Sequence, residues 1–149
     1  MAIPDPLSRR ELLHSKQKRP VDFAAVGEEY LAKGRLSDAL DFFDKVADRA
    51  DRERRIAKVR DLAVGMGDAF LLARVNALLP LEKDHWLRGL EKARSLGKTR
   101  HALRCARQAG EAAEVARLEL ELGLRAPEPE PAPAPESAPE PAEPSAAPE

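Results

Sequence analysis

The feature that most limits how this chain can fold is a repeated segment in which a glycine separates two amphipathic stretches. Residues 34–40, 65–70 and 97–103 share this segment. The small residues at the matching places are Ala39, Ala69 and Ala102, spaced 30 and 33 residues apart. A small residue early in the second stretch would let two helices approach closely, so the repeat predicts a series of helical hairpins.

Within each stretch, apolar residues recur every three or four positions, which is the period of an α-helix. The predicted packing stripes of the second hairpin are Ile56, Val59, Leu62, Ala63 and Met66, then Ala69, Phe70, Leu72, Ala73, Val75 and Leu79. Those of the third are Trp86, Leu87, Leu90, Ala93 and Leu96, then Ala102, Leu103, Ala106 and Ala109. A further amphipathic helix at 111–122 is expected to seal the open end. The sequence contains no run of alternating apolar and polar residues that would predict a strand.

These elements predict an all-α protein, a short α-solenoid of about three antiparallel helical hairpins with a C-terminal capping helix. We divide the chain into a basic N-terminal segment with a short helix at 1–20, a helical repeat domain at 21–125 and a tail at 126–149. The tail contains only Pro, Ala, Glu and Ser. It has no large apolar side chain to bury, so we expect it to be disordered.

Charged residues are distributed unevenly between the body of the chain, residues 1–125, and this tail. All 25 Lys and Arg residues precede residue 126, whereas the tail carries six Glu, so a basic body precedes an acidic tail. This asymmetry fits an anionic partner, and it equally fits a tail that imitates one. Ordinary solvated helix faces and a spacer tail would give the same composition.

The first hairpin resembles a tetratricopeptide repeat over residues 21–51. The residues that carry the resemblance, in order and spacing, are Phe23, Val26, Gly27, Tyr30, Gly34, Ala39 and Phe43. Val46 stands where the family has Ala, and Asp51 replaces its closing Pro. The third hairpin matches in part and the second is degenerate and about three residues short. The resemblance implies a right-handed superhelix whose first helices line a concave groove, and a role as a scaffold or adaptor.

Residues that could support catalysis or cofactor binding are few. His101 and Cys105 share one helix face, but no further ligands are in view, and Cys105 fits a small packing residue better than a metal ligand. Gly97-Lys98-Thr99 lacks the strand and partner glycine of a phosphate-binding loop. No pair of acids lies in an apolar setting suited to general acid-base work. We therefore predict a protein that is not an enzyme, with no cofactor and no metal site.

Basic residues on the first helices of the second and third hairpins are the candidates for partner binding: Arg55, Lys58, Arg88 and Lys92. Arginine can hold a carboxylate with two parallel hydrogen bonds, so the expected function is a protein-protein interaction scaffold or adaptor that binds a protein or acidic peptide. The alternatives are a weak nucleic-acid or polyanion binder and a structural subunit that docks into a larger assembly. The composition disfavours nucleic acid, because Phe23, Tyr30, Phe43 and Trp86 lie on packing stripes and cannot stack on bases.

The expected cellular compartment rests on three features that the sequence lacks: a pair of cysteines, a signal sequence and a membrane span. One cysteine cannot form an internal disulfide, and the N-terminus has no apolar signal sequence. No apolar run is long enough to span a membrane, so we expect a cytoplasmic protein with no membrane partner. The sequence leaves the identity of the partner and the oligomeric state open.

Overall fold

The computed structural model describes residues 3–15, 20–129 and 131–132, and in them the chain is all-α, with eight helices and no strand. The helices are α1 (Pro6–His14), α2 (Phe23–Ala32), α3 (Leu36–Phe43), α4 (Arg49–Met66), α5 (Ala69–Leu78), α6 (Lys83–Ser95), α7 (Thr99–Ala109) and α8 (Ala112–Glu121). None of the helices in these residues is both long and apolar enough to cross a membrane. The expected disordered tail falls mostly outside the described residues.

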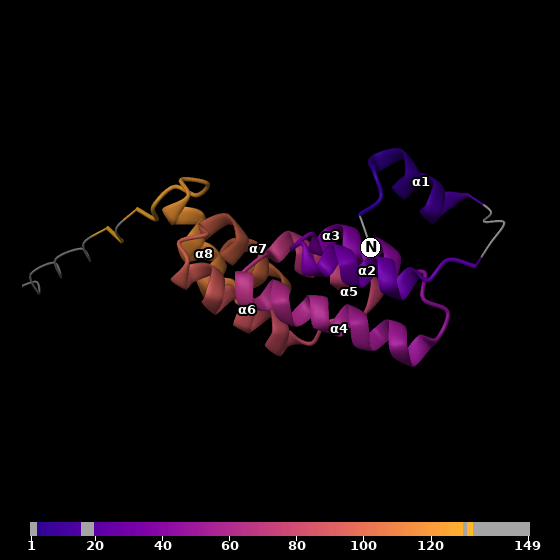
Figure 1. The fold of residues 1–149 in the computed structure, drawn as a ribbon. Helices are drawn as coiled ribbons and strands as arrows, with labels where there is room; N and C mark the ends of the chain where they lie inside the picture. The colour runs from indigo at the N-terminus through magenta and orange to yellow at the C-terminus, as the bar shows by residue number, and fades with distance from the viewer. Residues whose placement is uncertain (1–2, 16–19, 130, 133–149) are drawn as a thin grey trace, which may run out of the picture.

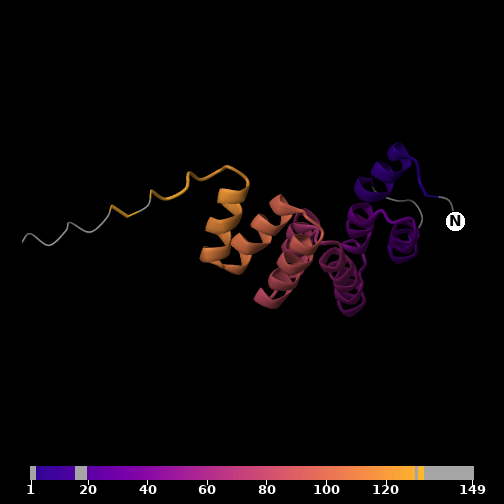
Figure 2. The same ribbon diagram turned by 90° about the vertical axis from the view of Figure 1, so that its left-hand side faces the viewer.

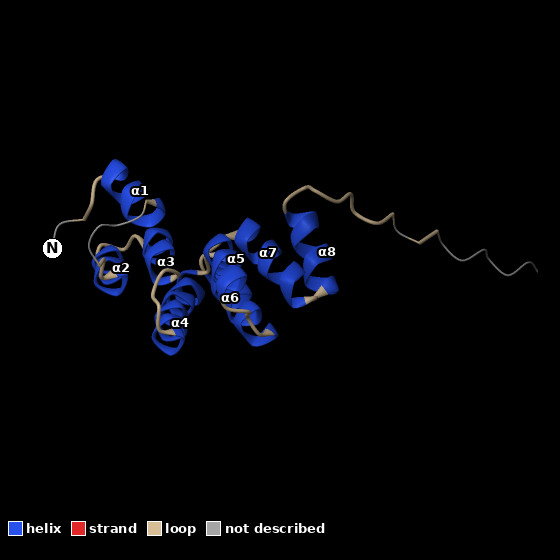
Figure 3. Ribbon diagram, turned by 90° about the vertical axis from the view of Figure 1, so that its right-hand side faces the viewer, coloured by secondary structure: helices blue, strands red, loops and turns tan. Residues whose placement is uncertain are grey.

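The helices pack as hairpins in chain order (Figure 1). Helix α2 packs on α3, α4 on α5 and α6 on α7, and α8 then packs on α7. The three hairpins follow one another in a row, with α1 near one end and α8 at the other (Figures 2 and 3). The second and third hairpins contact each other through α4 with α6 and α5 with α7, whereas the first meets the second mainly through α3 on α4.

One turn geometry recurs at the ends of the helices α2, α4, α6, α7 and α8. Each is followed within two residues by a glycine with positive φ, in the order Gly34, Gly67, Gly97, Gly110 and Gly123. The residue after the glycine donates its N–H to a carbonyl five positions back, as Arg35 does to Tyr30 at 2.9 Å and Lys98 does to Ala93 at 2.8 Å. The glycine also donates its own N–H to a carbonyl three positions back, as Gly34 does to Leu31 at 3.0 Å, and the two hydrogen bonds form a Schellman cap. This cap reverses the chain within about two residues, so consecutive helices become antiparallel neighbours.

The turn of the second hairpin corrects the alignment expected from the sequence. Its left-handed residue is Gly67 rather than Gly65, and the following helix therefore starts in the same register as the others. In that register Leu72, not Ala69, corresponds to Ala39 and Ala102. Leu72 points toward α6, where a Cβ added to Gly89 would lie 2.9 Å from its Cδ1 atom. The missing side chain of Gly89 thus makes room for a leucine of the neighbouring hairpin.

The core runs continuously through the row of hairpins. Its largest completely buried side chains are Tyr30, Phe42, Phe43, Leu40, Ile56, Leu72, Val59, Val75 and Cys105. In the first hairpin the rings of Tyr30 and Phe42 stack with centroids 5.2 Å apart. The ring of Phe43 fills the space over Gly27, because an added Cβ there would lie 2.4 Å from Phe43 Cε1. This contact joins α2 to α3 through one glycine and one aromatic ring.

Several stripe residues predicted to be packed are exposed instead: Leu62, Met66, Phe70 and Leu96. Counted back from the glycine that ends each helix, Ala63 and Ala93 occupy the same buried position, four residues before it. Leu62 and Met66 lie five and one residues before Gly67, which places them at the edge of the buried face. The stripe prediction was wrong at these positions because it extended the apolar face across one more row of the helix.

The short N-terminal helix packs on the first hairpin. Asp5 caps it by accepting the N–H groups of Leu7 and Ser8 at 3.0 and 3.1 Å. Arg9 reaches α3, where its guanidinium forms ion pairs with Asp38 at 2.9 Å and with Asp41. Residues 16–19 of the predicted basic N-terminal segment lie outside the described residues.

Candidate functional site

The four cations proposed from the sequence lie on two neighbouring helices, α4 and α6, which pack directly against each other. Lys58 and Arg88 stand nine residues before Gly67 and Gly97 respectively, so they occupy equivalent positions. Leu62 and Lys92 stand five residues before the same glycines, and Met66 and Leu96 stand one residue before them. We call these six residues the α4/α6 surface: Lys58, Leu62, Met66, Arg88, Lys92 and Leu96.

Arg55 does not belong to this surface, because its charge is used inside the molecule. Its guanidinium pairs with Asp51 at 3.0 Å and with Glu28 of α2 at 2.6 Å, and its side chain is only 20% exposed. The hydrogen bond that Arg55 donates to Asp51 raises the pKa of Arg55 and lowers the pKa of Asp51. The guanidinium also lies over the ring of Phe43, 5.8 Å from its centroid. These contacts tie the second hairpin to the first.

Lys58, Arg88 and Lys92 remain available to a partner, to different degrees. Lys58 is 57% exposed and its Nζ lies 3.3 Å from Glu28 Oε2. Arg88 pairs with Asp84 one turn away on the same helix at 2.9 Å, with both side chains largely exposed. Such exposed pairs contribute little and exchange readily with a competing carboxylate. Lys92 is exposed and forms no ion pair with any residue that the structure describes.

The exposed apolar members were missed from the sequence, since Leu62, Met66 and Leu96 were expected in the core. Each is exposed by more than two fifths of its surface. A surface on which large apolar side chains lie beside cations can bind both the apolar residues and the carboxylates of an acidic amphipathic segment. The signal that could have found them is their distance from Gly67 and Gly97, which repeats between the two helices.

The histidine and cysteine that share a face of α7 each have a structural role. His101 Nδ1 accepts the N–H of Ala69 at 3.1 Å and so links the third hairpin to the second. Cys105 is completely buried, and this burial raises the pKa of its thiol to about 11. In the residues that the structure covers, no three His, Cys, Asp or Glu side chains are grouped as metal ligands would be.

Comparison with known proteins places this chain in no family. No protein-family model, no curated protein and no solved structure matches it.

Proposed function

We propose that this chain is a non-enzymatic interaction module of the cytoplasm that binds an acidic peptide or an acidic segment of another protein. Its hairpins would act as a scaffold related in design to tetratricopeptide repeats, and its first helices would present the binding surface. The observation that carries the proposal is the α4/α6 surface, on which exposed cations and exposed apolar side chains occupy equivalent positions of two packed helices.

Physical chemistry favours an acidic amphipathic ligand over a purely charged one. Exposed cations alone bind polyanions weakly and lose them at moderate salt, because each contact is screened. The side chains of Leu62, Met66 and Leu96 add an apolar contribution that salt does not weaken. A segment that combines carboxylates with large apolar residues would use both parts of the surface, which gives selectivity over nucleic acid.

The test is a selection from a library of random displayed peptides on the full chain, followed by affinity measurement of the selected peptides. We expect enrichment of peptides that combine Asp or Glu with Leu, Ile, Phe or Trp. The double variant Arg88→Glu with Lys92→Glu should weaken their binding by about tenfold or more.

The matched control is Arg10→Glu with Arg117→Glu. It also reverses the charge of two exposed side chains. Arg117 pairs with Glu114 on its own helix at 4.0 Å, as Arg88 pairs with Asp84. The control should bind as the unchanged chain does. No enrichment of acidic peptides, or equal losses in the two double variants, would contradict the proposal.

A further inference from the structure

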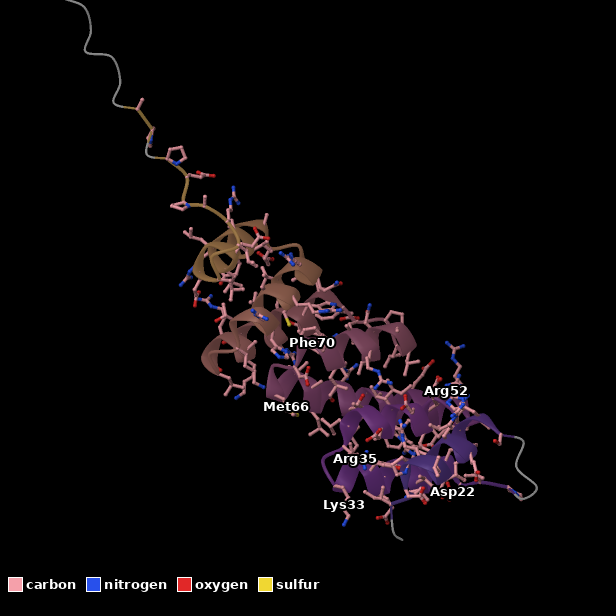
Figure 4. The ribbon with its side chains drawn as sticks, turned by 90° about the horizontal axis from the view of Figure 1, so that it is seen from above. Asp22, Lys33, Arg35, Arg52, Met66 and Phe70 are labelled. Atoms are coloured by element: carbon pink, nitrogen blue, oxygen red, sulfur yellow. The ribbon has the colours of Figure 1, made fainter. Side chains whose placement is uncertain are left out.

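A second surface, formed by α5, α7 and the end of α8, has a different composition. Phe70, in the first turn of α5, is 53% exposed although it is a large aromatic residue. It lies midway along the row of hairpins (Figure 4). It lines an open pocket with a volume of about 440 Å³. The other lining residues are Arg100, Leu103, Arg104, Arg107, Leu122 and Leu124.

The ring of Phe70 is held in place by two residues of α7. The guanidinium carbon of Arg104 lies 4.7 Å from the ring centroid, and His101 meets the ring edge-on with centroids 5.0 Å apart. His101 is itself fixed by its hydrogen bond from the Ala69 N–H. An exposed aromatic ring that is oriented in this way loses little conformational entropy when it binds a ligand.

Two of the three arginines that line this pocket form no ion pair in the described part of the chain. Arg100, Arg104 and Arg107 recur at helical spacing along one face of α7, which contains no acidic residue. Arg107 pairs with Glu119 of α8 at 2.7 Å. Arg100 and Arg104 form no ion pair within the described part of the chain. Two guanidinium groups therefore face solvent next to an apolar pocket.

The pocket is large enough for one substantial side chain. Leu103 forms its floor at 5% exposure, and Leu124 stands at its rim with 66% exposure. The volume lies within the range of pockets that hold small ligands or anchoring side chains. A ligand with an aromatic or large aliphatic group close to its negative charges would contact both the apolar residues and the arginines of this pocket.

We propose that the α5/α7 pocket, defined by Phe70, Arg100, Arg104 and Leu124, is a second binding site that takes an acidic peptide segment through one aromatic or large aliphatic anchor flanked by carboxylates. The arginines hold the carboxylates and the anchor contacts Phe70 and the leucines. The chain's own tail fits this site less well. It supplies carboxylates but contains only Pro, Ala, Glu and Ser, so it has no large apolar anchor.

The test measures binding of a fluorescent peptide, in which one Phe is flanked by Glu residues, to the full-length protein. A matched peptide carries Ala in place of the Phe. We expect the Phe peptide to bind about tenfold more tightly than the Ala peptide. Arg100→Glu with Arg104→Glu should weaken both peptides by tenfold or more, and Phe70→Ala should weaken only the Phe peptide. Circular dichroism of each variant is the control that these exposed substitutions leave the helices intact.

Controls separate this site from the α4/α6 surface and from other occupants. The α4/α6 surface is proposed to bind peptides of the same kind, so the measurements are repeated in the Arg88→Glu/Lys92→Glu variant. In that variant, adding Arg100→Glu with Arg104→Glu should still weaken binding of this probe by about tenfold or more. An unchanged affinity there would overturn the assignment to α5 and α7. Equal binding of the Phe and Ala peptides would also overturn it. So would complete competition by a short oligothymidine, or a tenfold gain in affinity when the six Glu residues of the tail are changed to Gln in the full chain.

Discussion

The junction between the first and second hairpins is held differently from the junction between the second and third. At the first junction, side chains reach across: Arg55 to Glu28 at 2.6 Å and Arg74 to Asp41 at 2.6 Å. At the second, the backbones themselves approach, since a Cβ added to Gly67 would lie 2.7 Å from the Cα of Ala93. Ion pairs between long, flexible side chains tolerate small movements of one hairpin against the next, whereas a close backbone contact does not.

Hydrogen bonds between the two turns reinforce the second junction. Lys98 donates from Nζ to the carbonyl of Met66 at 2.7 Å, and the Ala69 N–H donates to His101 Nδ1 at 3.1 Å. The second and third hairpins therefore form one closely packed unit, against which the first hairpin rests through α3, Arg55 and Arg74. Both proposed binding surfaces draw residues from the second and third hairpins, so their geometry depends on the closer junction.

The largest effect is expected from Phe43→Ala in the first hairpin. The ring is completely buried, fills the space over Gly27 and lies under Arg55, so its loss leaves a cavity within the hairpin and weakens its contact with α4. We expect the free energy of unfolding to fall by about 3 to 5 kcal/mol. Chemical denaturation measures this loss. A decrease below about 1 kcal/mol would show that the ring is not a core element.

The next effect tests the closer junction through Gly67→Ala. The residue has a φ of 59°, which alone costs a non-glycine residue about 1 to 2 kcal/mol. The added methyl group would also meet the backbone of Ala93. We therefore expect a loss above about 2 kcal/mol, with faster amide hydrogen exchange at the ends of α4 and α6. Gly34→Ala is the control, since φ is 72° there and an added Cβ meets nothing within 4 Å. Equal losses at Gly34 and Gly67 would contradict the close approach at the second junction.

A smaller effect is expected at the first junction from Glu28→Gln. This change removes the ion pairs of Glu28 with Arg55 and Lys58 but keeps the size of the side chain. Because Glu28 is partly exposed, the loss in stability should be about 0.2 to 1 kcal/mol at low salt. It should shrink in high salt, where such pairs are screened. A loss that does not depend on salt would show that the contact is not electrostatic.

The smallest effect on stability at neutral pH concerns Cys105, which lies in the closer unit beside Gly89. Burial raises the pKa of its thiol to about 11 from an ordinary value of 9.0. The thiol of Cys105 therefore holds its proton more strongly in the folded protein than in the unfolded chain. The resulting contribution to stability is complete below pH 9 and is lost as the pH rises toward 11.

Reaction with a thiol reagent near pH 8 measures this burial. We expect the folded protein to react very slowly and the unfolded protein to react at the rate of a free thiol. Rapid reaction of the folded protein would show that α7 opens readily at this position.

The helices and the glycines that follow them could be predicted largely from the sequence, because periodic apolar residues and closing glycines are local signals. Tyr30, Ile56 and Trp86 were correctly placed in the core, as were Ala102 and Ala106 on α7. The all-α class was confirmed. The predicted register of the second hairpin was wrong, because Gly65 and Gly67 are both candidates for one turn. Gly67 adopts the left-handed conformation and lies against the backbone of Ala93, a contact between hairpins that the local sequence does not show.

The candidate sites were less predictable than the fold. The cations of the α4/α6 surface were found from their spacing, but their ion pairs with Glu28 and Asp84 depend on which helices become neighbours or which rotamers form. The α5/α7 pocket was not expected, because Phe70 looked like a packing residue. An acid-free run of arginines in α7 was the one local signal for it.

The most direct test of the central claim is affinity capture from a native extract by the immobilised full-length protein, at moderate and at high salt. The unchanged chain is compared with Arg88→Glu/Lys92→Glu and with the matched control Arg10→Glu/Arg117→Glu. We predict that a discrete protein is retained at both salt concentrations, is lost by the first double variant and is kept by the control. Retention of nucleic acid alone, released at high salt, would contradict the account. So would equal retention of the same protein by all three forms.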